Sequence, residues 1–212
     1  TIAAYPVTIL IEGETGCGKE VLAKHVHDLS ERRNKPFVKL DCTTLPPNLM
    51  ETELFGHEKG AFTGADKMRI GRIEQADGGT LFIDEISNLS LSAQAKLLDF
   101  LHSFEISRIG SNRRTKVNVR VIAASNIPLQ LMVKKKLFRE DLFYRINSIQ
   151  ITIPPLRERK IDIPVLAELF VNEACVTLKK EKKKLDPEVF PVLMTRKWPG
   201  NARELRSVIF EA

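Results

Sequence analysis

A glycine-rich segment near the start of the chain has the residues and spacing of a phosphate-binding loop. It follows a short apolar run, precedes a helical pattern and reads Gly13-Glu14-Thr15-Gly16-Cys17-Gly18-Lys19-Glu20. Glycines let the backbone curl until successive N–H groups face one phosphate, and the N-terminus of the following helix adds a favourable dipole. Lys19 would reach the β- and γ-phosphates as a point charge. The segment therefore predicts a nucleotide site.

One position departs from the usual pattern of such loops. The residue after the lysine is normally Ser or Thr, whose hydroxyl binds Mg²⁺, but here it is Glu20. A glycine-rich turn that binds no ligand is the competing interpretation. The loop taken alone leaves both interpretations open.

A second motif favours the nucleotide site. An apolar strand pattern that follows Gly78 and Gly79 ends in two carboxylates, Asp84 and Glu85. In a sheet that places it next to the phosphate loop, Asp84 can hold Mg²⁺ directly or through water. Glu85 can polarise the attacking water as a general base. Such an ending also occurs at ordinary strand-to-turn junctions, but its combination with the phosphate loop indicates nucleotide hydrolysis.

Short apolar runs alternate with longer helical patterns over most of the chain. The predicted buried strands are Val7–Ile11, Phe37–Leu40, Thr80–Ile83, Arg120–Ala124 and Ile149–Ile153, and the clearest helices are Glu20–Leu29 and Ser92–Ser103. This alternation predicts an α/β fold with a mainly parallel sheet covered by helices. Ligands of such sheets bind at the carboxyl ends of the strands.

The pattern changes at Ile153-Pro-Pro-Leu156, and everything after it reads as helix. The segment Ile161–Lys180 is amphipathic, Asp186-Pro187 predicts a helix start, and Asn201–Glu204 resembles a capping box. A small all-α part therefore follows the α/β part.

We place the boundary near residue 154, with an α/β nucleotide-binding subdomain over 1–154 and an α-helical subdomain over 155–212. The chain begins at Thr1 rather than Met and stops inside a predicted helix at Ala212. We therefore expect it to be a truncated piece of a longer protein.

The net charge of +6 raises the question of nucleic-acid binding. Much of it comes from Lys134–Lys136 and Lys179–Lys184, and no aromatic residues are interleaved there for base stacking. Such runs are more typical of solvated helix ends. The charge alone does not indicate a partner.

Cysteine usage and hydropathy limit the class of protein. Cys17, Cys42 and Cys175 are odd in number and widely spaced, which favours reduced structural thiols over disulfides or a zinc site. No apolar run is long enough to span a bilayer, and no signal segment opens the chain. We expect a cytoplasmic protein without membrane contact.

The segment Glu53–Ala65 resembles the signature of the bacterial enhancer-binding proteins, the sigma-54-dependent transcription activators within the AAA+ class. Its centre is the highly specific six-residue loop Gly60-Ala61-Phe62-Thr63-Gly64-Ala65. The similarity continues through Gly71–Gly79, Phe138–Arg145, Pro154–Arg159 and Trp198–Leu205. It thus covers essentially the whole chain. An acidic residue after the phosphate-loop lysine is normal in this family, which accounts for Glu20.

The resemblance implies an AAA+ P-loop ATPase with a five-stranded sheet and a helical lid, which uses ATP and Mg²⁺. The loop from Gly13 to Glu20 would bind ATP, while Asp84 and Glu85 would serve the magnesium ion and the water. Asn126 matches the sensor of the γ-phosphate, and Arg203 matches the sensor carried by the lid.

The resemblance also implies partners. Arg139 and Arg145 match the arginine fingers that act on a neighbouring subunit's nucleotide in a homo-oligomeric ring of six or seven subunits, although arginines beside Glu140 and Asp141 also form ordinary surface pairs. The loop Gly60–Ala65 would carry Phe62 and Thr63 at a mobile tip that contacts sigma-54. ATP hydrolysis would then remodel the sigma-54 RNA polymerase holoenzyme to activate transcription. DNA contact is expected through a domain absent from this chain.

Asp41 departs from the family pattern. It stands where the family usually has Asn, the residue proposed to hold the catalytic glutamate away from water in a switching role. An Asp that faces Glu85 would repel it unless one of them is protonated or a cation intervenes. Asp41 therefore keeps open a second function, an ATP-sensing regulatory module with little turnover. The basic net charge keeps open a third, an AAA+ motor that acts on DNA.

Overall fold

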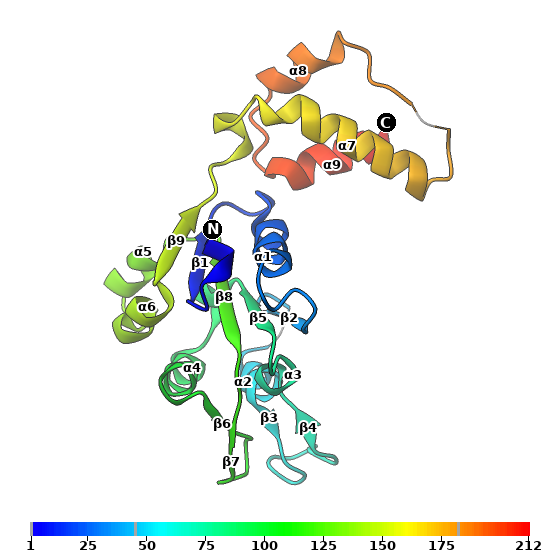
Figure 1. Ribbon diagram of the computed structural model, residues 1–212. Helices are drawn as coiled ribbons and strands as arrows, with labels where there is room; N and C mark the ends of the chain where they lie inside the picture. Colours follow the sequence, from blue (N-terminus) through cyan, green and yellow to red (C-terminus); the bar gives the residue numbers. More distant parts are fainter. Residues whose placement is uncertain (1, 45, 182) are drawn as a thin grey trace. The chain divides into compact units, whose positions relative to one another are not determined.

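The short apolar runs of the sequence form one central sheet. Its strands are β1 (Ile9–Glu12), β2 (Phe37–Asp41), β5 (Thr80–Asp84), β8 (Arg120–Ser125) and β9 (Ile149–Thr152), in the order β2-β5-β8-β1-β9 (Figure 1). The pairings β2–β5, β5–β8 and β8–β1 are all parallel. Every residue of β1 and β8 is buried, as expected for strands covered on both faces. The five predicted strands are therefore confirmed, with ends shifted by one or two residues.

The computed structural model describes residues 2–44, 46–181 and 183–212. Within it, the chain forms two units. The first contains the residues up to Glu12 together with Glu20–Ile151, and the second contains Gly13–Lys19 together with Thr152–Ala212. The phosphate loop is thus grouped with the C-terminal helices rather than with the sheet. Residue 182, within the predicted lysine run Lys179–Lys184, lies outside the described part of the chain.

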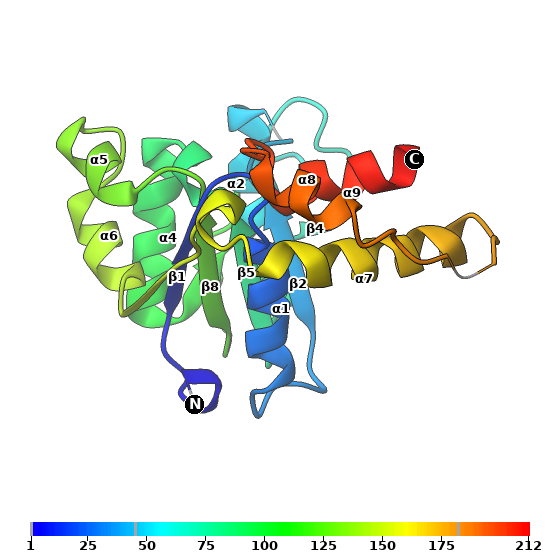
Figure 2. The same ribbon diagram turned by 90° about the horizontal axis from the view of Figure 1, so that it is seen from above.

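The segments that connect the strands of the first unit contain helices. They are α1 (Lys19–Asp28), α2 (Pro47–Phe55), α3 (Arg72–Gln75), α4 (Leu91–Ser103), α5 (Leu129–Lys134) and α6 (Glu140–Ile146), with short 3₁₀ turns at Ile2–Ala4 and Ile86–Asn88. Figure 2 shows α4, α5 and α6 beside one another. Ser90 caps α4 by accepting a hydrogen bond from the Ala93 N–H, which explains its sharp start.

Two small antiparallel hairpins extend from this unit. They are formed by β3 (Gly56–His57) with β4 (Arg69–Ile70), and by β6 (Glu105–Ser107) with β7 (Arg114–Lys116). The hairpins are joined because Ile109 donates to the Gly56 carbonyl and accepts from the Glu58 N–H, each at 3.0 Å. Sequence reasoning did not predict these strands, since two or three residues carry too little alternation to be recognised.

The C-terminal helices form a second, separate core. They are a 3₁₀ turn at Leu156–Glu158, then α7 (Asp162–Thr177), α8 (Val189–Thr195) and α9 (Asn201–Glu211), and α7 packs along α9 (Figure 1). Trp198 is almost fully buried there, and its indole N–H donates to the Leu193 carbonyl at 2.7 Å. This arrangement satisfies the polar end of a buried aromatic ring.

Two predicted helix starts in this region were wrong in detail. Helix α8 begins at Val189, because the Asp186 carboxylate accepts from the Glu188 N–H and forms a turn first. In α9, Glu204 does bond back to the Gly200 N–H at 2.8 Å, but the Asn201 side chain does not cap the helix. It points instead toward the phosphate loop, as described below.

Candidate nucleotide-binding site

The phosphate loop leaves the end of β1 and runs directly into α1. Gly16 and Gly18 adopt φ angles of +79° and +104°, which are the left-handed conformations that only glycine reaches without strain. Lys19 is the first residue of α1, and its Nζ donates to the Gly13 carbonyl at 2.8 Å. The lysine therefore closes the loop on itself, with its charge at the N-terminus of a ten-residue helix. This is the geometry of an anion-binding loop.

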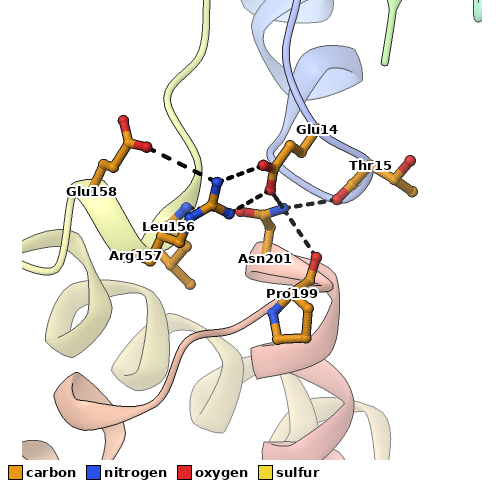
Figure 3. Close-up of polar contacts among 7 residues, drawn as sticks. All are labelled: Glu14, Thr15, Leu156, Arg157, Glu158, Pro199 and Asn201. Atoms are coloured by element: carbon orange, nitrogen blue, oxygen red, sulfur yellow. Dashed lines mark hydrogen bonds and ion pairs between the residues drawn. The ribbon is translucent and has the colours of Figure 1, made fainter. Parts of the chain in front are cut away.

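Residues of the helical unit hold the loop from one side. Figure 3 shows the Glu14 carboxylate bound by both terminal nitrogens of Arg157, at 2.8 and 2.7 Å, and by the Asn201 amide at 3.2 Å. The same amide nitrogen donates to the Thr15 carbonyl at 3.0 Å. Hydrogen bonds from Arg157 and then from Asn201 lower the pKa of Glu14 to about 2, so this carboxylate is ionised at neutral pH.

The two carboxylates of the second motif lie where predicted, at the carboxyl end of β5. Asp84 is the last residue of the strand, and Glu85 follows in a left-handed conformation with φ of +54°. Only 8 % of Glu85 is exposed. Its Oε2 accepts a hydrogen bond of 2.7 Å from the backbone N–H of Asn126, just after the neighbouring strand β8. The predicted general base and the predicted sensor are therefore in direct contact.

The surroundings of Asp84 fit a magnesium ion that is shared with phosphates. Among the described residues, no three His, Cys, Asp or Glu side chains gather into an all-protein metal cage. Mg²⁺ typically uses one or two carboxylates and completes its shell with water and substrate phosphates. Asp84 supplies such a carboxylate, and its Oδ2 already lies 3.2 Å from a cation, the ammonium nitrogen of Lys39. Asp84 would thus hold the ion.

Asp41 is in register with Asp84 across the β2–β5 pair. Its Oδ1 accepts hydrogen bonds from the Thr43 N–H at 2.9 Å and the Thr43 hydroxyl at 2.5 Å. Burial, and then the negative charges of Asp41, Asp84 and Glu85, raise the pKa of the Cys42 thiol far above its ordinary value. The extra carboxylate at position 41 therefore adds to an already negative edge of the sheet.

The two candidate arginine fingers lie at the start and the end of α6. Arg139 pairs with Asp141 through two hydrogen bonds, of 3.0 and 2.7 Å, as the surface-pair alternative predicts. Arg145 donates to the Leu101 carbonyl at 3.2 and 2.6 Å. Both side chains are exposed, so each could exchange these contacts for a phosphate.

The six-residue loop Gly60–Ala65 lies between β3 and β4. Phe62 is 40 % exposed and packs edge-on against the His57 ring, and Thr63 is exposed. Gly60 and Gly64 adopt φ angles of +80° and +93°. At the base of the hairpin, Arg108 pairs with Glu58 at 2.9 Å and with Glu74 at 2.8 Å. The loop therefore has an exposed tip, and ion pairs hold the residues at its base.

Arg203 and the three cysteines are the other residues that the sequence analysis singled out. Arg203 is exposed in the first turn of α9, and its backbone N–H donates to the Gly16 carbonyl at 3.3 Å. The cysteines are free and buried, as predicted. Burial raises the pKa of the Cys17 thiol, which agrees with an unreactive structural role.

Comparison with known families decides the identity of the chain. Residues 1–152 match the sigma-54 interaction domain, and residues 157–212 match the AAA+ ATPase lid domain. The chain belongs to the sigma-54 interaction domain family. This family carries the AAA+ P-loop fold, so the resemblance and the fold inferred from the sequence are both confirmed.

Relatives of this sigma-54 interaction domain are transcription regulators. It is 51 % identical over 211 residues to the DNA-binding transcriptional activator HyfR of Escherichia coli, covering 100 % of this chain and 32 % of HyfR. It is 47 % identical to the regulatory protein FlbD of Caulobacter vibrioides, covering 100 % and 46 %. The chain thus spans less than half the length of these relatives.

A solved structure of NtrX from Brucella abortus in complex with ADP has a similar fold. The TM-score is 0.90 at 36 % identity, over 98 % of this chain and 45 % of NtrX. NtrX in complex with ATP gives a TM-score of 0.89. Chains of the Hsp104:ATPγS complex, at 21 % identity and a TM-score of 0.71, share the fold alone.

The contacts that three residues make with the candidate site residues were not predicted from the sequence. Lys39 binds Asp84, Arg157 binds Glu14, and Asn201 binds Thr15. Lys39 could have been found, since it lies two residues before Asp41 and shares its face of the strand. Arg157 and Asn201 lie in segments that match the family, Pro154–Arg159 and Trp198–Leu205, but nothing in the sequence assigns their partners, which lie more than 140 positions away.

Proposed function

We propose that this domain hydrolyses ATP and uses the energy to remodel the sigma-54 RNA polymerase holoenzyme, thereby activating transcription. The observation that carries the proposal is the position of Glu85 beside Asp84, with its carboxylate held by the Asn126 N–H. A carboxylate with a fixed orientation at the end of a P-loop sheet is suited to polarise water. The relative NtrX, whose structures contain ADP and ATP, supports the choice of nucleotide.

Each of the site residues has its own role in the proposed ATP hydrolysis. The loop Gly13–Glu20 binds the phosphates, and Lys19 exchanges its contact with the Gly13 carbonyl for the β- and γ-phosphates. Asp84 would hold Mg²⁺, which when bound would supply positive charge against the charge that develops on the phosphate oxygens. Glu85 takes the proton of the attacking water, and Asn126 orients both Glu85 and the γ-phosphate.

The site is completed by a second copy of the chain. In a ring of six or seven subunits, Arg139 and Arg145 leave Asp141 and the Leu101 carbonyl to reach the neighbouring subunit's ATP. A finger supplied in this way accelerates hydrolysis by roughly 10³–10⁵-fold. A monomer should therefore be nearly inactive.

The loop Gly60–Ala65 contacts sigma-54, with the exposed Phe62 and Thr63 at its tip. In this proposal, residues 1–154 form the nucleotide-binding subdomain and residues 155–212 form the lid. The protein is cytoplasmic, and a domain outside this chain contacts DNA. The glycines of the loop give the tip backbone freedom, and Arg108 pairs with Glu58 and Glu74 at its base.

The test is the rate of ATP hydrolysis per subunit across a wide range of protein concentration. We expect the rate to rise steeply with concentration, and the Glu85→Gln variant to stay at background at every concentration. Binding of ATP with a flat, background rate would contradict the motor. It would support instead the ATP-sensing module that the extra carboxylate at Asp41 suggests.

A further inference from the structure

Four consecutive residues of the phosphate loop are held by the helical unit that follows the sheet. Glu14, Thr15, Gly16 and Cys17 each accept at least one hydrogen bond from that unit. The donors are Arg157, Arg159, Asn201 and the backbone of Arg203. Every residue from Glu14 to Cys17 is therefore contacted by that unit.

Asn201 is the centre of this contact. It is fully buried and adopts φ of +55°, a conformation that Asn tolerates better than most residues. Its Oδ1 accepts from the Leu156 N–H at 2.7 Å, which fixes which end of the amide is the donor. The Nδ2 must then point toward the loop, where it reaches the Thr15 carbonyl and the Glu14 carboxylate (Figure 3).

Arg157 adds a second, charged contact from the same unit. Its guanidinium binds Glu14 through two parallel hydrogen bonds, the geometry that gives an arginine–carboxylate pair its orientation (Figure 3). Arg159 donates to the Cys17 carbonyl at 2.6 Å. A Cβ on Gly16 would lie 2.3 Å from the Gly200 carbonyl oxygen, so the backbones also meet closely here.

These contacts orient the peptide groups of the loop. In a trans peptide the carbonyl of one residue and the N–H of the next point in opposite directions. Since the Thr15 and Cys17 carbonyls face the lid donors, the N–H groups of Gly16 and Gly18 face away from them. We expect those two N–H groups to donate to a bound phosphate.

We propose that Asn201 and Arg157 are positioning residues that keep the phosphate loop in its anion-binding form, so that the lid sets nucleotide affinity through the protein backbone as well as through Arg203. This inference rests on the proposed nucleotide site and adds a regulation to it. Loss of the bonds to Glu14 and Thr15 would lower the affinity for nucleotide.

The test compares two variants with matched chemistry. Arg157→Met removes the pair with Glu14, whereas Arg206→Met removes a pair with Glu173 that is also bidentate, exposed and within the helical unit, but does not touch the loop. Binding of Mg·ADP is measured by calorimetry on the full protein, with thermal melting recorded alongside. We expect Arg157→Met to weaken ADP binding by roughly tenfold, the effect of losing the charge-assisted pair with Glu14, and Arg206→Met to bind normally.

A second pair of variants separates positioning from folding. Asn201→Gly tolerates the same φ but lacks the amide, and Asn201→Asp keeps the acceptor for Leu156 but loses the donor to Thr15. Both should bind ADP weakly and also melt at a lower temperature, because Asn201→Gly leaves the Leu156 N–H without its acceptor and Asn201→Asp places a carboxylate beside Glu14. Binding is therefore measured well below the melting temperature of each variant. Hydrogen exchange should show faster exchange in residues 13–19 of both variants.

The outcomes distinguish this inference from the proposed function. Failure of the unmodified protein to bind ADP would contradict the nucleotide site and the inference together. Normal binding by the unmodified protein, Arg157→Met and Asn201→Asp alike would overturn the inference alone. Equal weakening by Arg157→Met and Arg206→Met would also overturn it, since the effect would then reflect general lid stability.

Discussion

The ammonium nitrogen of Lys39 lies 3.2 Å from the Asp84 carboxylate and 2.6 Å from the Glu20 carboxylate. Burial lowers the pKa of Lys39, but the hydrogen bonds to these two carboxylates outweigh it and raise the pKa overall. Lys39 is therefore charged at neutral pH. Its ammonium group contacts the Asp84 carboxylate oxygen that would also bind Mg²⁺.

Removing this charge should make magnesium easier to bind. Two unit charges at this distance interact with on the order of 1 kcal/mol even at the dielectric constant of water. Lys39→Met should therefore lower the Mg²⁺ concentration needed for half-maximal ATP binding by about fivefold. Magnesium titrations of fluorescent ATP binding measure this. Lys24→Met, which removes an exposed lysine paired with Asp28, is the control and should leave the titration unchanged. An unaltered magnesium requirement in Lys39→Met would show that the lysine does not compete.

Asp41→Asn should raise the rate of ATP hydrolysis. The change restores the residue usual in the family and removes one negative charge from an edge that already carries Asp84 and Glu85. Asn Oδ1 can still accept from the Thr43 N–H, so the local turn should persist. Turnover at saturating ATP is the measurement, with Asp41→Ala as the control that lacks the acceptor. The same rate in Asp41→Asn and the unmodified protein would refute the idea that Asp41 impairs the switch.

If Arg139 acts on the nucleotide of the neighbouring subunit, a variant without Arg139 and a variant without Glu85 should complement each other in mixed rings. Arg139→Met and Glu85→Gln should each be inactive alone, because one lacks the finger and the other lacks the base. Mixed rings should recover part of the activity, since a Glu85→Gln subunit can offer its Arg139 to a neighbour whose Glu85 is intact. ATPase assays of mixtures at several ratios measure the recovery. Mixtures as inactive as the separate variants would place Arg139 outside the neighbouring site.

Thr63→Ala should separate ATP hydrolysis from work on sigma-54. The residue is exposed in the loop between β3 and β4, so its loss should leave the fold and the ATPase rate unchanged. Binding to sigma-54 and activation of transcription should both be lost. Ser111→Ala, on the neighbouring β6–β7 turn, is a suitable surface control. Full transcription activation by Thr63→Ala would argue against this loop as the contact.

Local patterns in the sequence were sufficient for the strands, the phosphate loop and the two carboxylates. Buried parallel strands are continuous apolar runs, and the left-handed conformations at Gly16 and Gly18 require glycine, so both leave a direct mark on residue type. The pair Asp84 and Glu85 was recognisable because a strand ends there. Each of these features depends on residues that are close neighbours in the chain.

Contacts between distant segments could not be read in this way. Asn201 looked like a helix cap because Glu204 follows it, yet its amide binds Thr15, 186 positions away. Lys39 lies within the predicted buried strand Phe37–Leu40. The sequence places it on the same face as Asp41, but only the pairing of β2 with β5 brings it to Asp84. Hydrogen bonds and ion pairs of this kind depend on where folding brings two segments together. A single sequence records the polar groups but not their partners, because backbone carbonyls and carboxylates accept from any donor within reach.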